Sequence, residues 1–99
     1  MEFDAHVRRA LDSLPPEIAR RLENVAVVVE DEHPDDPDLF GLFQEEPYLP
    51  AKVTIFRRPL VEEFSDPREL EREIRITVLH EVAHYFGIDE ARLDELGYA

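Results

Sequence analysis

Residues 80–90 read HEVAHYFGIDE, and this motif is the strongest indication of the fold. His80 and His84 are four positions apart, which places them on one face of a helix with their Cβ atoms about 5–6 Å apart. Both rings can therefore reach one metal ion, and zinc prefers imidazole nitrogens. Glu81 follows the first histidine, so its carboxylate could act as a general base toward water at the metal.

The helix that carries this motif has a clear start and a clear stop. Asp66 is suited to cap its N-terminus, Pro67 to begin its first turn, and Gly87 to end it in a left-handed conformation. Residues 74–86 are apolar on most sides, which predicts a helix in the middle of the domain. Imidazoles and a carboxylate in such a helix need partners, because unpaired polar groups are costly to bury. A metal ion is one such partner, and a satisfied structural pair of histidines is the alternative.

The third metal ligand is expected just beyond the motif. A left-handed glycine allows the backbone to double back, and Gly87 occupies the third position after His84. Glu90 lies three residues further on and is the first candidate for the third ligand. Asp89 is the second candidate, although it is better suited to cap a helix, and Glu95 is the third. Alternatively, Glu90 is simply an exposed carboxylate in the first turn of a helix.

The chain before the motif opens with helical patterns and then becomes extended. Apolar residues at helical spacing predict a helix over residues 2–12, and a proline-led start predicts a short helix over residues 16–22. The run from Val25 to Val29 is typical of a strand that is buried on both faces.

The middle of the chain contains an acidic loop and a second strand. Residues 30–38 are almost entirely charged residues and prolines, so we expect a solvated surface loop there. Residues 39–43 are apolar and predict either a strand or a loop on the core. Residues 51–56 alternate and are β-branched, which predicts a strand, and residues 59–64 favour a short helix.

The composition supports one small, acidic domain. The 99 residues are enough for a single domain over residues 1–99, and the order of the elements indicates an α+β fold. There is no cysteine, so neither disulfides nor thiolate ligands are available. A net charge of −13 argues against binding to nucleic acid. No secretory signal or membrane-spanning run is evident, so we expect a cytoplasmic, monomeric protein without a membrane partner.

The remaining side chains with relevant chemistry are few. Tyr98, Tyr85 and Arg92 are candidates to stabilise an oxyanion, although we favour packing or surface roles for Tyr85 and Arg92. His6 and His33 are expected to lie on the surface without a metal role. A last helix is expected from Asp89 to about residue 96, closing at Gly97.

The extended motif resembles that of the bacterial minimal zincin-like family of metallopeptidases. Residues 80–90, 92–97, 12–16, 24–31 and 54–59 carry the likeness, which therefore spans essentially the whole chain. It implies a compact zincin core, with a small sheet against the motif helix and a zinc triad of two histidines and one acidic residue. The family usually has aspartate where this sequence has Glu90, whose extra methylene can still reach a metal. The likeness also places residues 41–53 at the rim of the cleft, where an edge strand would hold an extended peptide.

Three hypotheses follow from these observations. The first is a zinc metallopeptidase that binds one zinc ion through His80, His84 and Glu90, with Glu81 activating the water that attacks a peptide or protein substrate. The alternative is a non-catalytic module in which zinc stabilises the fold and the domain binds a peptide or protein. A metal-free helical domain is a third possibility.

Overall fold

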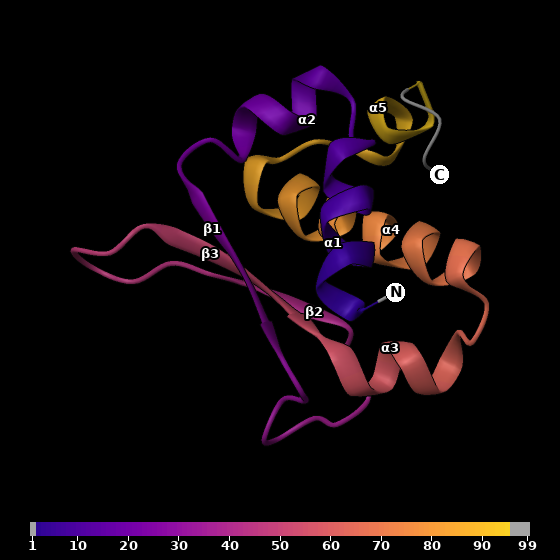
Figure 1. Cartoon of the computed structure of the whole chain (residues 1–99). Helices are drawn as coiled ribbons and strands as arrows, with labels where there is room; N and C mark the ends of the chain where they lie inside the picture. Colours follow the sequence, from indigo (N-terminus) through magenta and orange to yellow (C-terminus); the bar gives the residue numbers. More distant parts are fainter. Residues whose placement is uncertain (1, 96–99) are drawn as a thin grey trace.

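The computed structural model describes residues 2–95, which form five helices and three strands (Figure 1). In chain order these are α1 (Phe3–Asp12), α2 (Pro16–Arg21), β1 (Val25–Glu30), β2 (Gly41–Gln44), β3 (Ala51–Phe56), α3 (Arg57–Glu63), α4 (Pro67–Phe86) and α5 (Glu90–Glu95). The fold is therefore α+β, as the sequence predicts.

Helix α4 is the central element, and both of its predicted ends are confirmed. The backbone N–H of Glu69 donates to the Asp66 carboxylate at 3.2 Å, which caps the N-terminus. Gly87 closes the C-terminus in the left-handed region, with φ 69° and ψ 28°. The helix packs against α1, α3 and the sheet. Its buried side chains are Leu70, Ile74, Val78, Leu79, Val82 and Ala83.

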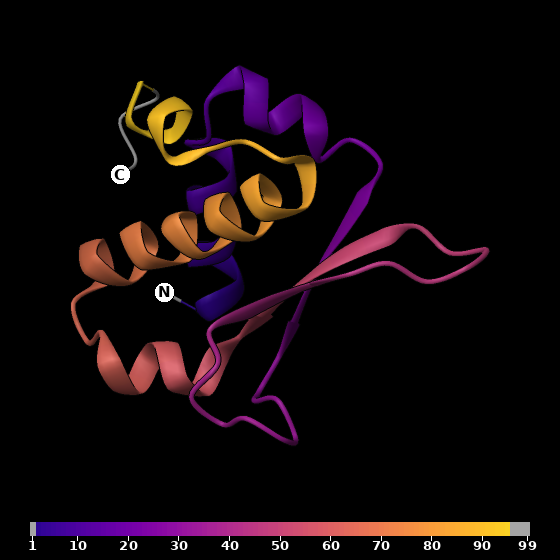
Figure 2. The ribbon, with the colours of Figure 1, turned by 180° about the vertical axis from the view of Figure 1, so that it is seen from behind.

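The three strands form one mixed sheet with the order β1-β3-β2. Strand β1 runs parallel to β3, and β2 runs antiparallel to it, so that Val27 and Phe43 both lie opposite Val53. The helices gather on one side of this sheet (Figures 1 and 2). The central position of β3 explains why its residues 53–56 are all buried.

The prediction that β1 is buried on both faces is wrong. Strand β1 lies at an edge of the sheet, where Val25, Val27 and Val29 are only partly buried against the core and Ala26 is exposed. Within residues 2–95 it pairs with β3 alone, and the helices cover only one face of the sheet. A run of valines therefore indicates a strand here without indicating its place in the sheet.

The connecting segments lie where the sequence predicts them, except that α3 begins two residues earlier than expected. Residues 31–40 form turns and bends without a helix or strand, as expected for the acidic loop. Helix α3 begins at Arg57, directly after β3, because Pro59 fits the first turn of a helix, where no N–H donor is needed. The expected end of the last helix, at residues 96 and 97, lies outside the described residues.

The core lies between the helices and the face of the sheet that they cover. It comprises residues from α1, α2, β3, α3 and α4, among them Val7, Ile18, Val53, Ile55, Leu60, Ile74, Val78, Leu79 and Val82. Within residues 2–95, none of the helices combines the length and the hydropathy that a membrane crossing requires.

Candidate metal centre

The C-terminal half of α4 presents the motif histidines to solvent. His80 and His84 are exposed one turn apart, while Glu81 is half-buried between the helix and the sheet. The neighbouring Leu79 and Val82 are fully buried, and they fix the rotation of the helix about its axis. The two imidazoles consequently face outward from a firmly packed helix.

The turn after α4 directs the chain back toward these histidines. The N–H groups of Gly87 and Ile88 both donate to the carbonyl of Ala83, the second at 2.8 Å. A Cβ atom on Gly87 would meet no other atom within 4 Å, so the positive φ, rather than lack of space, favours glycine here. The glycine stop expected from the sequence is confirmed.

Helix α5 then begins with the cap that the sequence predicts. The carboxylate of Asp89 accepts a hydrogen bond of 2.9 Å from the backbone N–H of Arg92. Leu93 is 2% exposed and is the one buried side chain of α5. Glu90, in the first turn, is exposed.

These segments enclose a pocket of about 460 Å³. Its polar lining consists of His80, Glu81, His84, Asp89 and Glu90, and its apolar lining consists of Ala83, Ile88 and Leu93. The structure thus brings every predicted site residue into one pocket, together with the second candidate ligand. Glu95, the remaining candidate, does not line the pocket and is paired with Arg92 instead.

The candidate ligands share this pocket without meeting at one point. Among residues 2–95, no three His, Asp or Glu side chains stand close enough together to hold a metal ion. The donor set nevertheless suits zinc, because it pairs two imidazoles with carboxylate oxygens. Within residues 2–95, the side chains of His80, His84 and Glu90 make no hydrogen bond to another residue, so they remain available to a ligand.

Glu81 has a partner that the sequence did not reveal. Its Oε1 accepts a hydrogen bond of 3.1 Å from the backbone N–H of Phe43 in β2, 38 positions away. The close approach of β2 to α4 depends on Gly41, where a Cβ atom would lie 2.5 Å from Cγ2 of Thr77. Glycine at this position therefore allows the edge strand to reach the motif helix.

A second hollow continues the pocket along the edge strand. It measures about 290 Å³ and is lined by Leu42, Phe43, Glu81, His84 and Tyr85. Glu81 and His84 line both hollows, so the space beside the histidines extends along β2. Within residues 41–53, which are expected at the rim of the cleft, β2 forms an edge strand in contact with the motif helix.

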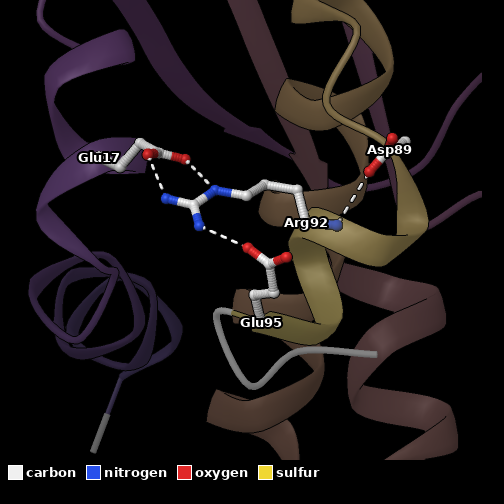
Figure 3. A network of polar contacts seen from close by, with 4 residues as sticks. All are labelled: Glu17, Asp89, Arg92 and Glu95. Carbon is white, nitrogen blue, oxygen red and sulfur yellow. Dashed lines mark hydrogen bonds and ion pairs between the residues drawn. The ribbon is translucent and has the colours of Figure 1, made fainter.

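The side chains considered for an oxyanion are already engaged. The ring of Tyr85 stacks on Phe43 with centroids 4.1 Å apart, and its hydroxyl donates to Glu45. The guanidinium of Arg92 donates to Glu17 and Glu95 (Figure 3). Tyr98, the third candidate, lies outside the described residues.

The two other histidines lie apart from the pocket, and the expectation for His6 is wrong. His6 is only 6% exposed, and its Nδ1 is hydrogen-bonded to Glu71, which joins α1 to α4. Its spacing from Phe3 and Ala10 places it on the inward stripe of α1, a signal that the sequence already contained. His33 is half-buried, edge-on to Phe56 at 5.7 Å between ring centroids.

Comparison with known proteins points in the same direction as this geometry. A family model described as "Zincin-like metallopeptidase" matches residues 22–98, which is more than three quarters of the chain. No curated protein matches the sequence. The matched region contains the sheet, α3, α4 and α5, and thus every residue of the pocket.

Proposed function

The chain belongs to the zincin-like metallopeptidase family, and from this premise we propose that it hydrolyses peptide bonds with zinc held by His80, His84 and Glu90. The observation that carries this proposal is the single pocket that these three residues line together with Glu81. When bound, zinc supplies Lewis acidity that polarises a peptide carbonyl and lowers the pKa of water toward neutrality.

Glu81 is the proposed general base. One of its carboxylate oxygens is held by the Phe43 N–H at 3.1 Å, which orients the group against the edge strand. The second oxygen can accept a proton from the attacking water and deliver it to the leaving amine. Because Phe43 belongs to β2, the sheet and the motif helix together position the base.

The peptide substrate is proposed to lie along β2. The hollow lined by Leu42, Phe43 and Tyr85 continues the pocket of the histidines, so an extended chain on this edge would pass Glu81 and His84. Ile88 and Leu93 also line the pocket of the histidines, where they offer apolar surface to a substrate side chain.

Digestion of a peptide library by the zinc-loaded chain, followed by mass spectrometry, tests this function. In the Glu81→Gln variant we expect cleavage to fall at least about a hundredfold while the zinc content is unchanged, since glutamine cannot accept the proton. Glu73→Gln is the matched control, because Glu73 is also half-buried on α4 but does not line the pocket. This control should cleave like the unmodified chain.

Two results would contradict the proposal. If Glu81→Gln cleaved as fast as the control, Glu81 would not be the base. If the chain bound zinc but cleaved no peptide of the library, the non-catalytic module that binds a peptide or protein would be the better account.

A further inference from the structure

Helix α5 carries the proposed third ligand but has few attachments of its own. It is only six residues long, and Leu93 is its single buried side chain. A helix of this length does not persist in water without tertiary contacts. One apolar anchor fixes the position of a helix, but it leaves the helix free to turn about that anchor. A second fixed point is therefore needed to hold Glu90 toward the pocket.

Arg92 provides this second point. Its Nη2 and Nε donate to the two carboxylate oxygens of Glu17 in α2, at 2.6 and 3.1 Å (Figure 3). Two parallel hydrogen bonds between a guanidinium and a carboxylate fix orientation as well as distance. Arg92 Nη1 also donates to Glu95 at 2.7 Å, which holds the guanidinium from its own helix.

The other end of this link is firmly held. Glu17 lies in the first turn of α2, directly before Ile18, whose side chain is completely buried in the core. The carboxylate that receives Arg92 is therefore part of a helix that is packed in place. Among residues 2–95, no side chain of α5 other than Arg92 is hydrogen-bonded to another helix, and both of these bonds go to Glu17.

The Arg92–Glu17 ion pair and the metal pocket lie on opposite sides of α5. Successive residues are rotated by about 100° around a helix, so Glu90 and Arg92 are about 200° apart and face opposite sides of α5. Arg92 points toward α2, whereas Glu90 lines the pocket beside His80 and His84. A turn of α5 that breaks the link would also change where Glu90 stands relative to the histidines.

We propose that Arg92 and Glu17 are positioning residues that hold α5 in the rotation at which Glu90 lines the pocket of His80 and His84, so that only a small further movement is needed for it to bind zinc with them. This inference rests on the proposed function, because it takes Glu90 as the third zinc ligand. The side chains of Arg92 and Glu17 are 45% and 30% exposed, so the pair contributes little to the free energy of unfolding. We therefore expect its loss to lower the affinity for zinc rather than the stability of the fold.

The test is a measurement of zinc affinity by competition with a chromophoric chelator. We expect Glu17→Gln to weaken zinc binding about tenfold, while the melting temperature of the metal-free protein changes no more than in a control. Glu32→Gln is a matched control, because it removes the same charge from an ion pair of similar exposure, with Arg58 at 3.0 Å, remote from the pocket.

A double-mutant cycle with Glu90→Ala separates the possible outcomes. If Glu17 acts through Glu90, Glu17→Gln will weaken zinc binding only in the chain that retains Glu90. If Glu90→Ala weakens binding but Glu17→Gln matches Glu32→Gln, the positioning role is wrong and the proposed function stands. If Glu90→Ala leaves zinc affinity unchanged, the ligand assignment fails, and the positioning role fails with it.

Discussion

Glu17 shows how the neighbours of one carboxylate on the surface alter its protonation. The hydrogen bonds from Arg92 lower the pKa of Glu17 below its usual value of 4.5, and the charges of Arg92, Arg21 and Arg20 act in the same direction. The same bonds, together with that of Glu95, raise the pKa of Arg92. Because the folded state lowers the pKa of Glu17, the small stabilisation from this exposed ion pair is fully present above pH 4.5. The stabilisation is lost as the pH falls through the lowered pKa.

A titration of the Glu17 side-chain carbon by NMR tests this directly. We expect a pKa below 4.5 in the unmodified chain and a higher pKa, close to the usual value, in Arg92→Gln. Arg58→Gln is the control, since Arg58 pairs with Glu32 and has no contact with Glu17. An unchanged Glu17 pKa in Arg92→Gln would mean that the two side chains are not paired in solution.

At the scale of elements, the site depends on how closely β2 approaches α4. The strand supplies the N–H that holds Glu81, and Gly41 is the position at which a Cβ atom on β2 would collide with the Thr77 side chain of α4. Thr77 faces Gly41 from α4, with its hydroxyl hydrogen-bonded to the Glu73 carbonyl at 2.8 Å. The orientation of the proposed base therefore depends on a missing Cβ atom in the strand.

Gly41→Ala should destabilise the metal-free chain by about 1–3 kcal/mol, because the new methyl group would lie 2.5 Å from Cγ2 of Thr77. Urea unfolding measures this change. Adding Thr77→Ser removes Cγ2 and keeps the hydroxyl, so the double variant should regain part of the loss. Gly87→Ala is the contrasting case, because its cost comes from the positive φ and Thr77→Ser should not relieve it.

The elements themselves could largely be predicted from the sequence, because their signals are local. Asp66 and Gly87 mark the ends of α4 through backbone chemistry, and the Asp89 cap of α5 follows the same logic. The edge position of β1 could not be predicted, since it depends on β3 entering the sheet between β1 and β2. Similarly, Phe43 and Glu81 meet across 38 positions, and no local pattern indicates such a contact.

At the scale of the whole molecule, small size and acidity have related consequences. A chain of 99 residues buries only about two-thirds of its unfolded surface, and a net charge of −13 adds repulsion within the folded state. A zinc ion in the pocket would offset part of the charge of Glu81, Asp89 and Glu90 and would stabilise the folded chain by mass action. The candidate ligands followed from the motif, whereas the attachment of α5 to α2 emerges only from the folded molecule.

Elemental analysis of the purified chain shows whether the motif histidines hold zinc. After saturation with zinc and removal of the excess, we predict close to one zinc ion per chain, falling to background in His80→Ala and in His84→Ala. A chain that retains no zinc after this treatment, or a zinc content that neither substitution reduces, would contradict a zinc site at these histidines.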